Sequence, residues 1–363
     1  MRVVVLGGTG NFGARIVRGL KDDPGIEVVA ASRSGRGVPG RGDVRTVALD
    51  VFAENLAARL RELAPDLVIH TVGPFQGQDY RVVRAALAVG AHYLDLADGR
   101  DFVVGFARAN HELAIGAGRA AISGASTLPA LSSAVIEQLR EGLRTVERVE
   151  MAIAPGQRAV RGAATMAAVF SYLGRPVGVW RGGQWVRSWG WMAMRRVPLA
   201  FGTRWGALCE VPDLSLIPTR YPEVQEVTFH AALEFRAQHV ALWLLAGLRR
   251  VGWPFAAERW AAALDRVSGA FDPFAGLWGG MRVSVVGESV KRERVRRTWQ
   301  LTAPAANGPE IPTLAAILLA RRLARNEHLA RGAYPCMGLL SLRDFESEFA
   351  RWNIRTRIEE GVA

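Results

Sequence analysis

The sequence predicts an α/β protein that begins with a doubly wound parallel sheet. A short apolar run at residues 3–6 leads directly into a glycine-rich turn, and further apolar runs then alternate with segments of helical periodicity as far as residue 122. This alternation is the pattern of consecutive βαβ units. Since a chain of 363 residues exceeds what one core usually supports, either two domains or one domain with a large insertion is expected.

We expect strands at residues 3–6, 27–31, 45–49, 67–70, 92–94 and 120–122. Helices are expected between them at 11–20, 53–63, 77–89 and 102–115. The strands are continuous apolar runs, as in sheets that are buried on both faces. Because ligands of such sheets bind beyond the carboxyl ends of the strands, the residues that follow each strand are the informative ones.

The first strand is followed by the spacing Gly8-x-Gly10-x-x-Gly13. In a dinucleotide-binding turn the first glycine permits the tight turn, the second lets the backbone approach the pyrophosphate, and the third lets helix and strand pack closely. The phosphates then lie at the N-terminus of the helix. The motif is weak alone, but here it follows a strand and opens a helix. The residues expected to bind the dinucleotide are Gly8, Thr9, Gly10, Asn11, Phe12 and Gly13.

The residues after the second strand favour NADP(H) over NAD(H). An acidic residue there would bind the ribose 2′-hydroxyl, but the sequence reads Ser32-Arg33-Ser34. A guanidinium offers bidentate geometry to a 2′-phosphate. The alternative is that Arg33 is a solvated loop residue and that Arg36 or Arg41 takes this role.

Three further strand ends are candidates to border the cofactor. The residues after the third strand would border the adenine, and a Gly-Pro turn after the fourth would approach the nicotinamide ribose. For each residue, helix capping and turn chemistry are the alternative. The candidates are Asp50, Val51, Gly73, Pro74, Phe75 and Asp95.

With these residues in place, the chain resembles the saccharopine dehydrogenase-like oxidoreductases. The resemblance rests on GGTGNFG, on HTVGPFQGQDYRVVRAALAVGAHYLDLADGRDFV and on GASTLPALSSAVIEQL, and it resumes in GPEIPTLAAILLARRLAR and RGAYPCMGLLSLRDF. One departure is the segment Asp98-Gly99-Arg100, where many relatives carry a Gly-Glu pair, so no role of that Glu is carried over. The family name is not carried over as a substrate either.

The resemblance implies an N-terminal Rossmann domain at 1–128, an inserted mixed α/β domain for substrate and dimerisation at 129–305, and C-terminal helices at 306–363 that return to the Rossmann domain. Within the second domain we expect strands at 146–153, 184–187, 226–235 and 281–302. Helices are expected there at 163–173, 238–251 and 256–267. Helices at 311–325 and 342–352 close the fold.

A short-chain dehydrogenase or epimerase also suits the glycine motif, but its chemistry needs a Lys four residues after a Tyr. Lys21 and Lys291 are the only lysines, and neither follows a Tyr in this way. The nearest imitation pairs Tyr80 with Arg84, and Arg stays protonated. We therefore favour the first resemblance over this one.

The function expected from these observations is an NADP(H)-dependent oxidoreductase. Hydride would pass to or from a C=N, C=O or activated C=C bond of a small molecule lying between the sheet's carboxyl edge and the second domain. Candidate proton donors are Tyr80, Tyr93, Asp98 and His230, each with a structural role as the alternative, and candidates to hold a substrate carboxylate are Arg158 and Arg161. The rival hypothesis is a non-catalytic dinucleotide-binding protein, either a redox sensor or a membrane-associated scaffold.

The composition limits which ligands and partners are expected for this protein. The net charge of +12 suits phosphates, carboxylates or an anionic membrane, and no nucleic-acid-binding motif accompanies it. The cysteines, Cys209 and Cys336, predict neither a disulfide scaffold nor a zinc site, so we expect no metal. The N-terminus carries no signal-peptide pattern, so a cytoplasmic protein is expected.

Residues 180–280 hold nine of the eleven tryptophans. One interpretation is a large core or a subunit interface, since aromatic rings dominate buried contacts. The other is a lipid-like substrate or a peripheral membrane contact, because Trp and Arg together suit the membrane interface. We expect a homodimer in either case.

Overall fold

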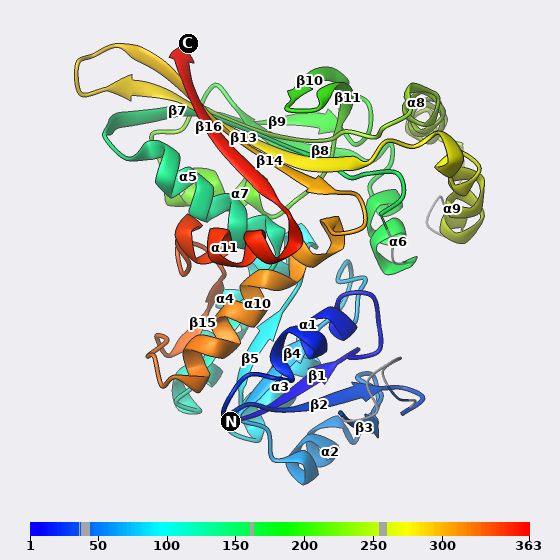
Figure 1. The fold of residues 1–363 in the computed structure, drawn as a ribbon, viewed down its shortest axis with the longest axis vertical. Helices are drawn as coiled ribbons and strands as arrows, with labels where there is room; N and C mark the ends of the chain where they lie inside the picture. The colour runs from blue at the N-terminus through cyan, green and yellow to red at the C-terminus, as the bar shows by residue number, and fades with distance from the viewer. Residues whose placement is uncertain (36, 38–43, 160–162, 254–259) are drawn as a thin grey trace. The chain divides into compact units, whose positions relative to one another are not determined.

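The computed structural model describes residues 1–35, 37, 44–159, 163–253 and 260–363, which form two compact units (Figure 1). The first unit is Met1–Leu131 with Pro309–Leu340, and the second is Ser132–Gly308 with Ser341–Ala363. The chain therefore contributes two separate segments to each unit.

The first unit contains a seven-stranded sheet in the order β15-β6-β5-β4-β1-β2-β3, with every neighbouring pair parallel. The doubly wound sheet predicted from the sequence is confirmed. Its strand order reverses between β4 and β1, which makes the carboxyl ends of these two strands the expected binding position. The strands are β1 Arg2–Leu6, β2 Glu27–Ser32, β3 Arg45–Ala48, β4 Leu67–His70, β5 His92–Asp95, β6 Ala120–Ser123 and β15 Gly332–Pro335.

Four helices connect these strands: α1 Gly13–Leu20, α2 Leu56–Leu63, α3 Arg81–Ala88 and α4 Arg100–Gly116. Neighbouring helices α2, α3 and α4 contact one another. Helices α2 and α3 begin later than the sequence predicts because turns precede them. The Asp50 carboxylate, for example, accepts the Phe52 N–H at 3.0 Å and stabilises a turn before α2.

The segment Pro309–Leu340 returns to the first unit and packs helix α10, Ile311–Ala324, against α1. Buried Glu310 accepts hydrogen bonds from Arg15 at 3.0 Å and from Arg18. Close helix packing depends on Gly19, where a Cβ would lie 2.6 Å from Ile317 Cδ1. The expected return of a C-terminal helix is thus confirmed, and β15 adds a seventh strand that the sequence did not predict.

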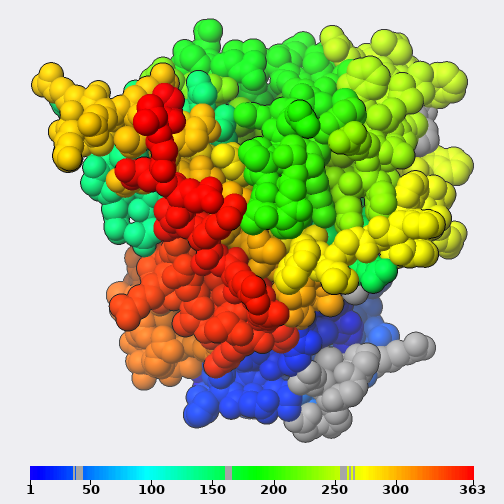
Figure 2. Space-filling model, turned by 45° about the horizontal axis from the view of Figure 1, so that its top comes forward, coloured from blue at the N-terminus to red at the C-terminus, as the bar shows by residue number. Residues whose placement is uncertain are grey.

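The last expected helix, α11 Leu342–Phe349, lies in the second unit and contacts α5 there, so residues 341–363 do not return to the nucleotide unit. A capping box starts α11, in which Ser341 and Asp344 bond to each other's backbone N–H. The chain then ends in strand β16, Arg355–Val362, at the edge of the second sheet and on the protein surface (Figure 2).

The second unit is a mixed sheet in the order β10-β11-β12-β7-β13-β14-β16, with β8 and β9 attached through β12. Strands β7 and β12 are parallel, and the other pairs are antiparallel. The strands are β7 Leu143–Ala154, β8 Pro176–Arg181, β9 Gln184–Trp189, β10 Arg195–Leu199, β11 Gly202–Leu208, β12 Glu226–Ala231, β13 Trp278–Ser289 and β14 Arg294–Pro304. The helices are α5 Ser132–Arg140, α6 Ala163–Ser171, α7 Asp213–Arg220, α8 Arg236–Arg250 and α9 Ala261–Gly269.

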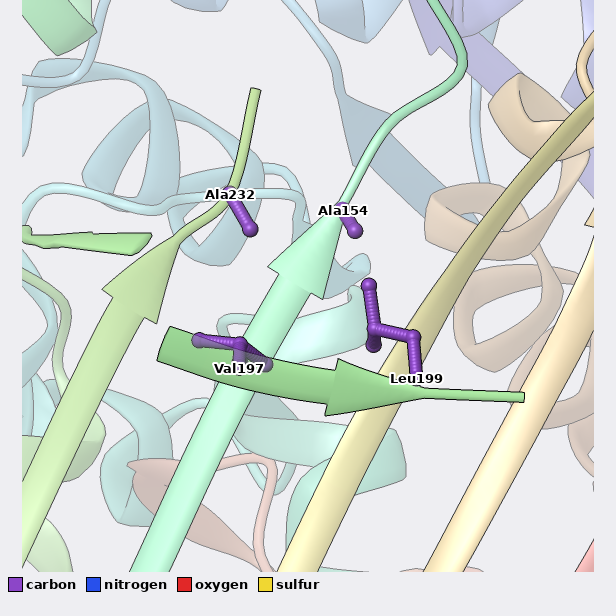
Figure 3. Close-up of a cluster of buried hydrophobic side chains, with 5 residues drawn as sticks. Ala154, Val197, Leu199 and Ala232 are labelled. Carbon is purple, nitrogen blue, oxygen red and sulfur yellow. The ribbon is translucent and has the colours of Figure 1, made fainter. Parts of the chain in front are cut away.

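The two faces of this second sheet differ in chemistry because side chains alternate along each strand. One face buries Val149, Met151, Val283 and Trp299, and helix α5 packs on strands β7, β13 and β14. The other face carries polar and charged side chains. Strand β10 crosses over that face and is held by the apolar contacts drawn in Figure 3.

Candidate functional site

The glycine turn after β1 has the geometry that a dinucleotide requires. A Cβ on Gly8 would lie 2.8 Å from the Ala30 Cβ of β2, and one on Gly13 would lie 2.1 Å from the Gly7 carbonyl oxygen. Gly7 has φ +80°, so the left-handed residue of the turn is the glycine before the motif. Gly10 is exposed and leaves its side of the turn open to a ligand.

The N-terminus of α1 offers backbone donors to an anion. Within the described residues, the N–H groups of Thr9, Phe12 and Gly13 make no hydrogen bond. No side chain caps this helix, and its first turn contains no acidic residue. A pyrophosphate would satisfy these donors and interact favourably with the helix dipole.

The end of β2 adds a hydroxyl and a guanidinium. Strand β2 ends next to β1, and the N–H groups of Gly7 and Gly8 both donate to Ala31 O, at 2.9 and 3.0 Å. The Ser32 hydroxyl is buried and has no hydrogen-bond partner in the described chain. Arg33 is exposed in the turn that follows, and the structure gives it no ion pair with any described residue. Arg36 and Arg41 lie outside the described residues.

Residues that follow the third and fourth strands, β3 and β4, border the expected dinucleotide position. Asp50 is exposed but holds the turn before α2, whereas Val51 is buried. Beyond β4, Thr71 donates its hydroxyl to Leu6 O at 2.8 Å, which ties this loop to the end of β1. Gly73 is partly exposed, Pro74 is exposed and Phe75 is buried, so the first two are the ones available to a ligand.

A buried polar cluster lies beneath the ends of β4 and β5. The Tyr93 hydroxyl lies 3.1 Å from His70 Nδ1, and both residues are almost wholly buried. Asp95 Oδ1 accepts hydrogen bonds from Gly124 N at 2.8 Å, from Ser123 Oγ at 2.9 Å and from Ala97 N at 3.0 Å. Asp95 therefore fixes the loops after β5 and β6 rather than contacting a ligand.

Burial sets the protonation of this cluster. It lowers the pKa of His70 to about 3, so the imidazole stays neutral. It raises the pKa of Asp95 to about 6 although the hydrogen bonds from Gly124, Ala97 and Ser123 oppose the shift. Sequence reasoning did not single out His70, whose only sign was a histidine at the end of an apolar strand.

The geometry separates the three candidate catalytic residues. Tyr93 is 0% exposed, so its hydroxyl cannot reach a substrate. Tyr80 donates to Phe102 O at 2.9 Å, and its ring packs on Phe102 and Phe106, which is a structural role. Asp98 is partly exposed in the loop after β5, and Oδ1 accepts from Gln76 Nε2 at 3.3 Å. Burial raises the pKa of Asp98 despite the Gln76 hydrogen bond, as suits a proton carrier.

The remaining candidates belong to the second unit. Arg158 donates to Asp272 O at 2.9 Å and so holds a loop, while Arg161 lies outside the described residues. His230 is 6% exposed, and burial lowers its pKa to about 4, so it is neutral at physiological pH.

Two other features of the described residues bear on ligands. A shallow depression of about 520 Å³ lies at the amino ends of β1 and β2, opposite the edge that carries the glycine turn. We therefore do not take it as the cofactor site. No group of three His, Cys, Asp or Glu side chains in the described part of the chain is arranged to hold a metal ion.

Comparison with known proteins agrees with this geometry. Residues 3–165 match the family model of the saccharopine dehydrogenase NADP binding domain. A search of curated protein sequences finds no match.

Solved structures extend the likeness to the whole chain. Apo saccharopine dehydrogenase (L-Glu forming) from Saccharomyces cerevisiae aligns with a TM-score of 0.70 and 12% identity, covering 99% of this chain and 100% of that chain. Homospermidine synthase from Legionella pneumophila, solved in complex with NAD, aligns with a TM-score of 0.61 and 12% identity, covering 99% and 91%. At such identity these likenesses establish the fold. Residues 3–165 are therefore similar to the saccharopine dehydrogenase NADP binding domain in sequence, and the whole chain shares the fold of saccharopine dehydrogenase.

Proposed function

We propose that this protein uses NADP(H) to transfer hydride to or from a C=N, C=O or activated C=C bond of a small molecule. The observation that carries the proposal is the glycine turn at α1, whose unbonded N–H groups lie beside a strand end that bears Arg33. When bound, the nicotinamide supplies the hydride chemistry, and the protein supplies binding, orientation and a proton.

Each group of residues has a stated role in this proposal. The N–H groups of Thr9, Phe12 and Gly13 hold the pyrophosphate, and Ser32 and Arg33 hold the 2′-phosphate. Asp50 and Val51 border the adenine, and Gly73 with Pro74 borders the nicotinamide ribose.

Asp98 carries the proton in this scheme. Asp98 is partly exposed after β5, whereas Tyr93 is buried and the Tyr80 hydroxyl is bonded to Phe102 O. Asp95 and Ser123 orient its loop from below through the hydrogen bonds described above.

The cofactor assignment is tested with Arg33→Ala, with Arg59→Ala on the exposed face of α2 as the matched control. We expect the dissociation constant for NADPH to rise at least about ten-fold in Arg33→Ala, the size expected for a lost charge-assisted hydrogen bond, while that for NADH changes less than about two-fold. Arg59→Ala should change neither. Equal weakening of both cofactors in Arg33→Ala would contradict the 2′-phosphate role.

Turnover separates an enzyme from a dinucleotide sensor. The wild type is mixed with NADPH and a panel of imines, ketones and enoyl thioesters. We expect one of these classes to be reduced with a turnover number on the order of 1 to 10³ per second. The loss of absorbance at 340 nm, where the reduced nicotinamide absorbs, measures this rate. Asp98→Asn should lower the maximal rate while leaving NADPH affinity unchanged. Tight NADPH binding without oxidation across the panel would favour the sensor.

A second candidate function, peripheral contact with an anionic membrane, is favoured by helix α8. Its outward face is apolar along Val240, Trp243, Leu244 and Leu248, and Leu244 is 53% exposed. Besides this apolar stripe, further exposed apolar side chains follow the helix along the chain: Val251, Trp253, Trp260, Val267, Phe274 and Leu277. Globular proteins rarely leave such a stripe uncovered, so it needs an occupant.

The charges around this stripe favour a lipid surface as the occupant. Arg236 and Arg250 are exposed at the two ends of α8, and no acidic residue occurs between them. Exposed Trp flanked by Arg is typical of helices that lie in the membrane interface. No helix in the described residues is long and apolar enough to cross a membrane.

Vesicle flotation tests this contact, with Leu244→Glu compared against Val362→Glu, an exposed apolar residue of β16 outside the stripe. We expect the wild type and Val362→Glu to float with phosphatidylglycerol vesicles at low salt and less at high salt, and Leu244→Glu to float at least about ten-fold less. The absence of wild-type flotation would overturn the proposal.

We also propose that the protein forms a homodimer, and light scattering of the same protein variants measures their oligomeric state. A dimer that Leu244→Glu dissociates would assign the stripe to a second copy instead.

A further inference from the structure

The polar face of the second unit's sheet gathers a cluster that has no part in the cofactor site. Strand pairing places Glu150 of β7 opposite Thr228 of β12 and Ser284 of β13. Arg282 lies two residues away along β13, opposite Ala152, so its side chain is on the same face as that of Ser284. Pairing of β13 with β14 brings Thr298 opposite Ser284. These residues come from four strands far apart in the sequence.

The charges in this cluster do not balance. The Glu150 carboxylate is shared by two guanidiniums, because Oε1 lies 3.1 Å from Arg195 and Oε2 lies 2.8 Å from Arg296. Arg282 is left with one long hydrogen bond, from its NH2 to Thr298 Oγ1 at 3.4 Å. Its Nε–H is buried and has no partner among the described residues. Glu359 of β16, opposite Thr298, also acts on Arg282 through its charge, so three arginines share two carboxylates here.

A second, independent observation comes from Thr228, which strand register places beside Glu150 on the same face of the sheet. Thr228 is 4% exposed, and its hydroxyl has no hydrogen-bond partner within the described chain. Buried polar groups are almost always hydrogen-bonded, so an unpaired hydroxyl and an unpaired guanidinium N–H together indicate a missing acceptor. His230 lines a small pocket in this cluster, and burial lowers its pKa to about 4, so it adds no positive charge at neutral pH.

Strand β10 forms the roof of the pocket. Val197 and Leu199 pack on Ala152, Ala154 and Ala232, and Figure 3 shows β10 crossing the sheet at this point. The same strand begins with Arg195 and Arg196, which line the pocket together with Arg282. The apolar contacts of β10 thus hold Arg195 and Arg196 near Arg282 of the sheet.

We propose that this pocket binds one small oxyanion, the phosphate or carboxylate group of a small metabolite, through Arg282 and Arg195 with Thr228 as an additional donor. Guanidiniums suit both groups because they donate two parallel hydrogen bonds to two oxygens. The cavity volume of about 20 Å³ is close to that of one water molecule, so it excludes a nucleotide and holds one oxygen of the anion, with the rest of the group beside partly exposed Arg195. The site lies wholly in the second unit and is independent of the proposed cofactor function.

Calorimetric titration of the full-length protein tests this site with inorganic phosphate and, in a second arm, acetate, both at constant ionic strength set with sodium chloride. We expect one saturable site per chain, and the ratio of the two affinities identifies the preferred group. Arg282→Gln should weaken binding at least about ten-fold, whereas Glu150→Gln should strengthen it, because it removes the competing carboxylate. Opposite effects of two neighbouring substitutions are not expected from a loss of structure.

Two control variants locate the binding. Arg294→Gln alters an arginine of β14 that pairs with Glu147 on the surface and should leave the affinity unchanged. Arg33→Ala should also leave it unchanged, since its site belongs to the first unit. If Arg282→Gln does not fold, Arg195→Gln at the pocket rim replaces it, with the same weakening expected. Absence of saturable binding of either anion, or binding that Arg33→Ala abolishes and the pocket variants leave intact, would overturn the proposal.

Discussion

In the first unit the groups arranged to hold an anion are backbone N–H groups at the start of α1, whereas in the second unit they are guanidiniums on strands β10 and β13. The first arrangement depends on glycines at fixed local spacing. The second depends on the pairing of β7, β12 and β13, whose residues are some 130 positions apart, from Glu150 to Arg282. A ligand site made of backbone is therefore sensitive to a single Cβ, and a site made of side chains is sensitive to charge.

The largest effect is expected from Gly13→Ala in the first unit. The new Cβ would lie 2.1 Å from the Gly7 oxygen and 2.7 Å from its carbonyl carbon, so β1 and α1 must separate. We expect NADPH affinity to fall by about 100-fold or more and the free energy of unfolding to fall by about 3 kcal/mol. Fluorescence titration and urea denaturation measure the two.

Gly116→Ala is the matched control for this variant, because a Cβ there meets no atom within 4 Å. It should leave NADPH affinity unchanged and stability equal or up to about 1 kcal/mol higher. Unchanged NADPH binding in Gly13→Ala would show that the turn does not hold the cofactor.

An intermediate effect is expected from Glu150→Gln in the second unit. Burial alone would raise the pKa of Glu150, but Arg195 and Arg296 outweigh it and lower the pKa below the ordinary 4.5. The carboxylate is thus stabilised by its partners, and removing its charge should cost about 2 kcal/mol of unfolding free energy at pH 7. This cost should disappear as the pH falls through the lowered pKa of Glu150. At pH 7, bound phosphate should restore part of the unfolding free energy that Glu150→Gln loses. A loss of the same size at pH 7 and at pH 3 would contradict the electrostatic account.

The smallest effect, of opposite sign, is expected from Asp95→Asn. Burial raises the pKa of Asp95 from 3.8 to about 6, so the folded state holds this proton more tightly than the unfolded state. Ionisation above pH 6 then costs stability, with the cost growing between about pH 4 and 6. The amide should therefore stabilise the protein by about 1 kcal/mol at pH 8, after the penalty of burying an unpaired N–H, and by nothing at pH 4. Urea denaturation at both pH values tests this, and a variant less stable than the wild type at pH 8 would contradict it.

The contrast between the units also explains what the sequence could predict. Strand β4 at Leu67–His70 matches its expected range, and the other expected strands of the first unit differ from theirs by a residue or so, because buried parallel strands are continuous apolar runs bounded by turns. The glycine spacing and Arg33 could be proposed as cofactor-binding residues from the sequence because both signals are local. The burial of Tyr93 and Asp95 could not be predicted, because a position near a strand end does not reveal whether the side chain points into the core.

The second unit was harder to predict because its structure depends on non-local pairing. The expected strand at 281–302 is a hairpin of β13 and β14, and β8, β10 and β11 were not expected at all. The polar cluster around Glu150 had no local signal, since its members become neighbours only through strand register. Strand β15 was missed because Gly332–Pro335 is too short for a pattern and pairs with β6, more than 200 residues earlier in the chain.

Strand β15 and helix α10 have a consequence for how the protein is made. The nucleotide unit needs residues 309–340 to cover the edge of β6 and to supply Glu310 as the partner of Arg15 and Arg18. During translation these residues emerge after residues 132–308 of the second unit, so the nucleotide unit cannot finish folding while that segment is being synthesised. A fragment cut at residue 165, where the family match ends, would expose an unpaired strand edge and aggregate, despite containing every residue proposed to bind the cofactor.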